Sequence, residues 1–330
     1  MNTHNNKYKY EKMSNLQTYV KLFISVCINF LCFLIIPHNL VAQSAIKPCQ
    51  KEPDFIKTLG FDPLWTALST SEKKLTGIAL IEFEQMEGQK SPSPTNPKKS
   101  VYQAPSWKSF GYLSSIAFDI NGNVYTIPTP LISMLYNPIE KLNTIYRLDQ
   151  YTGILNEWLN LPINSKANTR NPFGLLGITY DCTANVLIAS TVAGSDRYLE
   201  KGIIFLINPN TKKIIDSFTH KDAIGLAVAF DETKQKRLYI GSARNGNIIS
   251  IPINALGQLV KSKLRKELSL QGFGPRGDDK ARKIKMVDGA LIISGVAFNY
   301  NLQASSEKPE TVYTFKWNTA SKNWDLIDFK

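Results

Sequence analysis

The chain has 330 residues, of which 43% are hydrophobic and 20% are charged, and its formal net charge is +12. This length suits one large all-β domain as well as two ordinary domains, and it is ample for a substantial core. The basic excess favours anionic ligands or surfaces, although a solvated basic surface is the simpler interpretation. The charge is spread without a long basic block or a recognisable nucleic-acid module, so nucleic acid is excluded as the expected partner.

The first 43 residues have the pattern of a secretory signal peptide. Residues 1–21 are polar and basic, residues 22–36 form an apolar run, and small residues follow at 41–45. An uncleaved membrane anchor is the alternative, but a spanning helix needs about 20 apolar residues, which is more than this run provides. We therefore expect cleavage near Gln43 or Ser44, export to the periplasm or the exterior, and one mature domain at 44–330 with no membrane span.

Two cysteines follow the predicted leader, Cys49 and Cys182. In an oxidising compartment they can pair, and the bridge would tie the new N-terminus to the body of the domain. Two unpaired buried thiols are the alternative.

A repeated pair of hairpins is the strongest pattern in the sequence. The first hairpin alternates apolar residues, turns through Asp, Asn and Gly, and continues in a β-branched or aromatic run; copies begin at Ile116, Ile178, Val228 and Met286. A second hairpin follows each copy, with a residue that can cap its own turn at Asp149, Asn208, Asn254 or Asn318. A fifth copy of this second hairpin lies at residues 81–88.

Units of four strands that repeat in this way predict an all-β fold, a β-propeller of five or six antiparallel blades. Six blades are slightly favoured, because residues 45–75 joined with the C-terminus could complete a sixth. Residues 88–104 are rich in Ser, Pro and Lys, and this composition predicts a flexible insertion within a blade.

The run from Ile116 to Tyr125, IAFDINGNVY, resembles the blade signature of the gluconolactonase/regucalcin-like and NHL-repeat propellers. The resemblance implies the fold without specifying an activity, because propellers host many functions. Lactonase-like members hold a divalent metal over the central channel with carboxylates and an asparagine, where it polarises a lactone carbonyl and activates water. When this ligand pattern is carried over to the present sequence, only Asn171 and Asp222 correspond to metal ligands. No glutamate near the N-terminus corresponds to the remaining ligand.

The loops that lead into a blade and the loops that join its two hairpins share one face of a propeller. Here these loops are long and polar, and such loops are often functional. Their arginine and amide groups suit carboxylate or phosphate oxygens, and their aromatic groups suit sugar rings or planar groups. We expect ligand contacts from Trp107, Tyr136, Asn137, Lys141, Arg170, Asn171, Arg244 and Arg282. Alternatively, the arginines hold the loops by pairing with Glu140, Asp196, Asp222 or Asp279.

Arg244 lies between the hairpins of one blade and Arg282 lies just before the next, so propeller geometry predicts that they are neighbours. Two neighbouring guanidinium groups favour an anionic guest. His220 is the single histidine after the leader, which excludes a multi-histidine metal site. Gly272–Gly277 matches the dinucleotide-binding pattern, but Pro275 prevents the helix that such a site requires.

Three functions follow from these observations. The first is a monomeric exported propeller that binds an anionic small molecule or a sugar acid on its loop face. The second is a metal-dependent hydrolase of the gluconolactonase type, the one reading that implies a divalent metal cofactor. The third is an extracellular protein-interaction scaffold. The sequence alone leaves open whether the protein is an enzyme.

Overall fold

The computed structural model describes residues 51–72, 75–92, 95–130, 133–163, 170–302 and 310–330, which all belong to one compact unit. The predicted leader and Cys49 lie outside these ranges. Among the helices of the described ranges, none is long and apolar enough to span a membrane.

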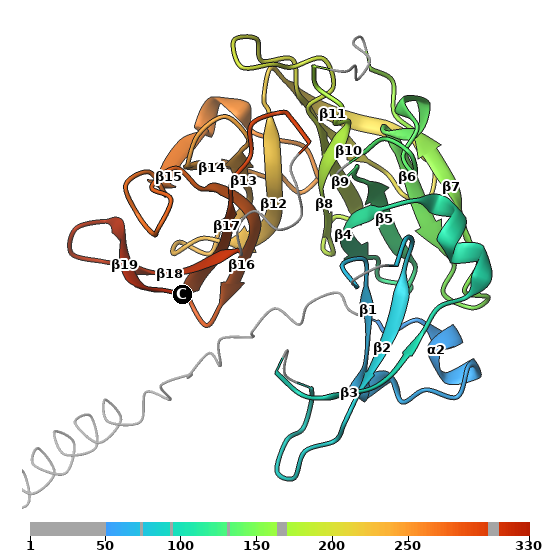
Figure 1. Ribbon diagram of the computed structural model, residues 1–330. Coiled ribbons are helices and arrows are strands. Elements are labelled where there is room, and N and C mark those ends of the chain that lie inside the picture. Colours follow the sequence, from blue (N-terminus) through green and yellow to red (C-terminus); the bar gives the residue numbers. More distant parts are fainter. Residues whose placement is uncertain (1–50, 73–74, 93–94, 131–132, 164–169, 303–309) are drawn as a thin grey trace, which may run out of the picture. The chain divides into compact units, whose positions relative to one another are not determined.

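Five antiparallel sheets follow one another in chain order, from blue to red in Figure 1. The first sheet has three strands, β1 (Thr66–Ser69), β2 (Ala79–Phe83) and β3 (Lys98–Tyr102). The other four sheets have four strands each. The second sheet contains β4 (Leu113–Phe118), β5 (Val124–Pro128), β6 (Thr144–Leu148) and β7 (Leu155–Asn160), and the third contains β8 (Leu175–Asp181), β9 (Val186–Thr191), β10 (Ile203–Ile207) and β11 (Ile214–Thr219). The fourth sheet contains β12 (Ala223–Phe230), β13 (Lys236–Ser242), β14 (Asn247–Pro252) and β15 (Arg265–Ser269), and the fifth contains β16 (Lys280–Val287), β17 (Ala290–Val296), β18 (Thr311–Asn318) and β19 (Asn323–Phe329).

Short helical turns connect some of these strands. An α-helix, α2 (Asp54–Thr58), precedes the first sheet, and the described residues include four short 3₁₀ helices: η1 (Pro63–Trp65), η2 (Pro105–Phe110), η3 (Ile139–Lys141) and η4 (Lys261–Lys263). The architecture is therefore all-β, as the sequence predicts.

The first strands of the four-stranded sheets lie against one another, β4 on β8, β8 on β12 and β12 on β16. They line a common axis, and the remaining strands run outward in order to β7, β11, β15 and β19. This arrangement confirms the β-propeller, with five blades among the described residues. The slight preference for six blades is corrected: residues 66–69 begin the first blade, and the C-terminal strand β19 pairs with β18 in the fifth.

An aspartate organises the turn of the first hairpin in the second, third and fourth blades. The Asp119 carboxylate accepts hydrogen bonds from the backbone N–H groups of Asn121 and Asn123 at 2.8 and 2.9 Å. Asp181 and Asp231 accept equivalent bonds in the turns that follow them. Because this capping uses residues adjacent in sequence, it fixes each chain reversal locally. The antiparallel pairing of the strands on either side of each turn confirms these three predicted hairpins.

A hydrophobic cluster fills each junction between consecutive blades. Leu80 and Val124 belong to the cluster between blades one and two, and corresponding clusters lie at the next three junctions. Many of these side chains are completely buried, and burial of one large aliphatic side chain contributes about 1.5–3 kcal/mol. No cluster within the described residues joins the first blade to the fifth.

Within residues 88–104, where the sequence predicts a flexible insertion, residues 98–102 instead form β3. Tyr102 on this strand packs edge-on against Trp107, with ring centroids 5.9 Å apart. Ser100 donates to the Glu82 carboxylate on β2 at 3.0 Å. Both partners, Trp107 and Glu82, lie outside residues 88–104, so the composition of this segment does not reveal them. Residues 93–94 lie outside the described residues.

Cys182, in the turn between β8 and β9, is disulfide-bonded. The other three cysteines all fall within residues 1–50, which the structure does not describe. The bridge between Cys182 and Cys49 therefore stays a prediction.

Candidate functional site

One end of the propeller collects the segments that lead into β4, β8, β12 and β16 and the loops that join the second and third strands of each blade. These segments share an end because antiparallel strands reverse direction at every turn. We call this end the loop face. A buried polar network centred on Asp222 spans it from the third blade to the fifth.

Asp222 immediately precedes β12, and its side chain is 0% exposed. Its Oδ1 accepts hydrogen bonds from Ser195 Oγ at 2.5 Å and from the Gly202 N–H at 2.8 Å. Its Oδ2 accepts from Arg244 Nη1 at 3.0 Å and from the Tyr300 hydroxyl. Burial raises the pKa of Tyr300, which keeps the phenol protonated as a donor. Four donors saturate the carboxylate, because it offers about four lone-pair sites.

Arg244 lies in the β13–β14 loop, and its terminal nitrogens are engaged by the protein. Besides Asp222, they donate to three backbone carbonyls of the β9–β10 loop, those of Asp196, Arg197 and Leu199, at 2.9, 2.8 and 3.3 Å. The guanidinium also lies 5.9 Å from the centroid of the Tyr300 ring. The alternative interpretation, an arginine that holds the loops by pairing with Asp222, therefore describes this side chain.

Arg282, near the start of β16, is the other member of the predicted anion-binding pair. Its Nη1 lies 3.7 Å from the Glu310 carboxylate, and its side chain is 38% exposed. Glu310 also pairs with Lys283 Nζ at 3.2 Å, so two cations share this carboxylate. Asp222 offsets the charge of Arg244, whereas the anion contact expected at Arg282 stays a prediction.

Asn171 is the other residue of the predicted metal set. Its side-chain nitrogen donates to the carbonyls of Val192 and Ser195, both at 2.8 Å, and its side-chain oxygen accepts from the Phe173 N–H at 3.1 Å. Because Asp222 is saturated as well, the residues present do not fit a divalent metal. Within the described ranges, no group of three or more His, Cys, Asp or Glu side chains is placed to hold one.

The remaining predicted contact residues are placed as follows. Trp107 is 1% exposed and belongs to the core cluster of the first two blades. Asn137 is buried, and its side chain donates to the Tyr112 carbonyl at 2.9 Å and accepts from the Tyr112 N–H at 3.2 Å. Lys141 pairs with Glu157 at 2.5 Å. Arg170 is exposed in the segment that leads into β8.

Four large hydrophobic side chains are exposed on corresponding loops of two consecutive blades at the loop face. Leu135 and Tyr136 in the β5–β6 loop are 77% and 51% exposed, and Tyr198 and Leu199 in the β9–β10 loop are 89% and 47% exposed. Sequence reasoning selected Tyr136 for its aromatic ring and missed the other three. The available signal was an adjacent tyrosine and leucine in corresponding loops of consecutive blades.

The turn that carries Tyr198 is fixed by two independent groups. The Asp196 carboxylate accepts from the backbone N–H groups of Tyr198 and Leu199 at 2.7 and 2.8 Å, bonds that lower the pKa of Asp196. Arg244 holds the carbonyls of the same turn from the neighbouring blade. Tyr198 is therefore highly exposed on an ordered backbone.

Tyr136 also lies on a restrained backbone. Its ring packs edge-on against Tyr112, with centroids 5.6 Å apart. Gly111, at φ +69°, approaches so closely that a Cβ there would lie 1.9 Å from the Tyr136 carbonyl oxygen. The close approach requires glycine and fixes the position of the β5–β6 loop.

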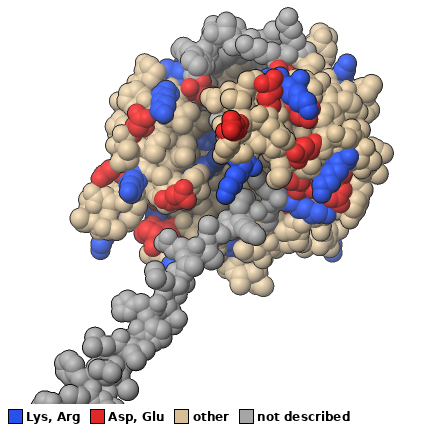
Figure 2. Space-filling view, turned by 90° about the horizontal axis from the view of Figure 1, so that it is seen from below, with Lys and Arg blue, Asp and Glu red and all other residues tan. Residues whose placement is uncertain are grey.

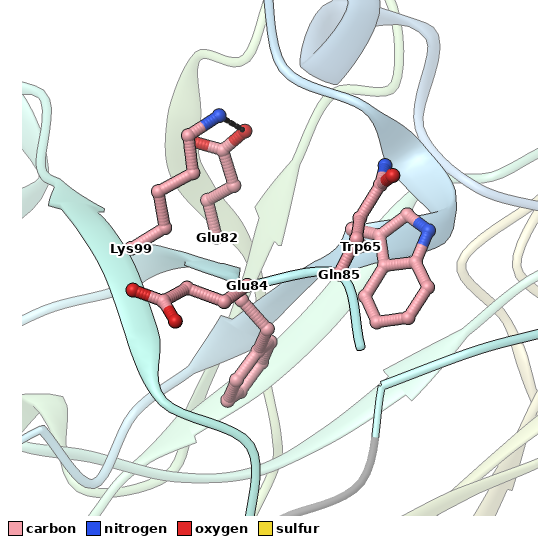
Figure 3. Close-up of a pocket in the computed structure, with 6 residues that line it drawn as sticks. Trp65, Glu82, Glu84, Gln85 and Lys99 are labelled. Carbon is pink, nitrogen blue, oxygen red and sulfur yellow. Dashed lines mark hydrogen bonds and ion pairs between the residues drawn. The ribbon is translucent and has the colours of Figure 1, made fainter. Parts of the chain in front are cut away.

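Two cavities lie beside the first blade. The larger, of about 500 Å³, is lined by Trp65, Glu82, Phe83, Glu84, Gln85 and Lys99 (Figure 3). Lys99 Nζ pairs with Glu82 at 2.9 Å and lowers the pKa of that carboxyl group. The second, of about 430 Å³, borders α2 and η1. Neither cavity is lined by a ligand-binding residue predicted from the sequence.

Charge does not single out a site on the face shown in Figure 2, where basic and acidic side chains lie interspersed. The net charge of +12 is not gathered there into one large basic patch.

No protein-family profile matches the sequence, and a comparison with curated proteins gives no match. Among solved structures, a glucose dehydrogenase is 15% identical over 70% of this chain and 72% of its own, with a TM-score of 0.40. A nidogen/laminin complex is 10% identical over 80% and 91%, with a TM-score of 0.42. The calcium-binding protein regucalcin of Agrobacterium tumefaciens is 12% identical over 76% and 66%, with a TM-score of 0.42.

The resemblance to gluconolactonase/regucalcin-like propellers holds at the level of the fold. Likenesses this distant carry no inference about activity, ligand or partner. The propeller assignment rests on the sheets and their packing.

Proposed function

We propose that this protein is an exported propeller that binds a partner protein through its loop face. The observation that carries the proposal is the set of four exposed side chains Leu135, Tyr136, Tyr198 and Leu199 on the loops of two consecutive blades. Tyrosine is enriched at the centres of protein interfaces, where its ring supplies a large contact area. An ordered turn loses little conformational entropy on binding, so these side chains are suited to recognition.

A protein partner suits the loop face better than an anionic small molecule. Small-molecule sites are concave pockets, whereas the polar groups of Asp222, Arg244 and Asn171 are used within the fold. Arg197 is exposed next to Tyr198 and favours a partner surface that carries an acidic group. The predicted leader supports export, which would make this partner extracytoplasmic.

Site-specific photo-crosslinking tests the proposal. A photoreactive phenylalanine analogue placed at Tyr136 or at Tyr198 should crosslink to the same partner in preparations of exported proteins. Tyr151 is the matched control, because it is 64% exposed but lies in the β6–β7 turn at the opposite end of the blade. An analogue placed at Tyr151 should give no crosslink to that partner.

The purified partner then allows a quantitative test. Tyr198→Ala should weaken binding by about 2 kcal/mol, or about thirtyfold in Kd, as is typical of an interface hot spot. Tyr151→Ala should leave Kd unchanged. Equal crosslinking from all three positions, or an unchanged Kd for Tyr136→Ala and Tyr198→Ala, would contradict the proposal.

A further inference from the structure

The centre of the loop face is filled by a short segment that follows β17. We call residues 297–302 the strap. Tyr300 is 5% exposed and belongs to an apolar cluster with five buried side chains of the third and fourth blades, Phe173, Leu176, Val192, Ile224 and Ala243. Phe298 of the strap packs on Phe173 with ring centroids 5.2 Å apart. The strap of the fifth blade thus covers an apolar basin formed by the two preceding blades.

The polar end of Tyr300 meets two charged groups at the edge of this basin. Its hydroxyl donates to Asp222 Oδ2, and its ring lies 5.9 Å from the Arg244 guanidinium. Asp222 is also held by Ser195 and Gly202, and Arg244 by the β9–β10 loop. Both groups are therefore positioned by contacts that do not involve Tyr300.

Together, the basin, the carboxylate and the guanidinium are complementary to a phenol. The apolar side chains suit an aromatic ring, the carboxylate is a strong acceptor for a phenolic O–H, and a guanidinium near a ring is attracted by its π-face. A neutral alkyl or phenyl group would leave Asp222 Oδ2 with one donor fewer, which disfavours such groups in this place.

The strap itself is attached by side chains. Among the described residues, no backbone–backbone hydrogen bond joins residues 297–302 to another segment. Tyr300 has φ +63°, a left-handed conformation that is strained for a bulky side chain and persists only where its contacts enforce it. Segments with few backbone bonds open at low free-energy cost, so the strap is suited to exchange.

We propose that the loop face carries a binding site for a phenolic group, and that Tyr300 is its resident occupant, which a phenol from outside displaces. The site consists of Phe173, Leu176, Ile224, Asp222 and Arg244. This inference rests on the contacts of Tyr300 and is independent of the protein-binding function proposed for Tyr136 and Tyr198.

Calorimetric titration with 4-methylphenol tests the site, with toluene as the probe that lacks the hydroxyl. Tyr300→Gly removes the resident ring and relieves the positive φ, so it should bind 4-methylphenol at least about tenfold more tightly than the natural chain. It should bind toluene at least about tenfold more weakly than 4-methylphenol, because toluene offers no donor to Asp222. Tyr151→Gly, at an exposed position in the β6–β7 turn away from the loop face, is the matched control and should leave the affinity of the natural chain for 4-methylphenol unchanged.

Displacement is tested on the natural chain by limited proteolysis with thermolysin, which cleaves before bulky apolar residues such as those of the strap. Saturating 4-methylphenol should accelerate cleavage within residues 297–302 by about fivefold or more, while toluene should not. Tyr300→Phe, which keeps the ring but loses the hydroxyl, should be cleaved faster than the natural chain without any probe. These two measurements decide the question even where Tyr300→Gly fails to fold.

Two outcomes would overturn the proposal. Equal affinity of Tyr300→Gly for toluene and 4-methylphenol would show an apolar cavity without recognition of the hydroxyl. Unchanged strap cleavage at saturating 4-methylphenol would show that Tyr300 is a permanent core residue. A capped Gly-Tyr-Gly peptide distinguishes the sources of the phenol: tighter binding than 4-methylphenol assigns the site to a tyrosine side chain of a polypeptide, and weaker binding assigns it to a free phenol.

Discussion

Replacing Arg244 with alanine is expected to destabilise the protein by about 3–5 kcal/mol, which is typical for removal of one partner of a buried ion pair. Asp222 would keep a charge at 0% exposure with one donor fewer, and the β9–β10 loop would lose the group that holds three of its carbonyls. Thermal unfolding followed by circular dichroism should show a fall in Tm of about 10 °C.

Arg197→Ala is the matched control for this experiment. Arg197 is exposed on the loop that Arg244 holds, and its side chain should contribute less than about 0.5 kcal/mol. An unchanged Tm for Arg244→Ala, together with loss of binding to inorganic phosphate or gluconate, would show that the guanidinium serves an anionic ligand and that the network is not structural.

Replacement of Trp107 with alanine should cost about 3–5 kcal/mol, the usual range for a large aromatic residue removed from a core. Trp107 joins three segments: its ring packs on Phe55 of α2 at 6.0 Å and on Tyr102 of β3 at 5.9 Å, and its indole N–H donates to the Gly153 carbonyl at 2.8 Å. Chemical denaturation should show the loss as a lower midpoint.

A conservative variant separates packing from the hydrogen bond. Trp107→Phe keeps an aromatic ring but leaves the Gly153 carbonyl without its donor, so it should cost about 1–2 kcal/mol. Tyr136→Ala, at an exposed position, should change stability by less than about 0.5 kcal/mol. If Trp107→Ala were as stable as the natural chain, the residue would be available for ligand contact, as the sequence first indicated.

The hairpins could be predicted because their chemistry is local. Asp119 and Asn123 are four residues apart, and the carboxylate that closes the turn bonds to groups of the same turn. The strand at residues 98–102 could not be predicted in this way, because Glu82 and Trp107 stabilise it from outside the segment. The number of blades depends on such long-range pairing, which local patterns do not encode.

At the candidate site too, the sequence predicted local features but not contacts between residues far apart in the chain. The sequence placed Arg244 on the correct loop and named Asp222 among its possible partners, and this pair forms. It did not indicate Tyr300, which lies 78 residues from Asp222 and reaches it because the fifth blade folds beside the fourth. Trp107 and Asn137, which the sequence predicted as ligand contacts, are buried. Residue type alone does not show whether a loop side chain contacts a ligand or stabilises the loop itself.

The four hydrophobic junctions described above join blades that are consecutive in sequence, and within the described ranges none links the first blade to the last. A fold with this connectivity behaves as a linear array, in which stability is a sum of nearest-neighbour terms, as in solenoid proteins. Each blade can pack on the preceding blade as soon as both have formed, because each of these junctions is built from the residues of two consecutive blades. Because synthesis delivers the N-terminal blades first, such stepwise packing shortens the time during which apolar strands are exposed to aggregation.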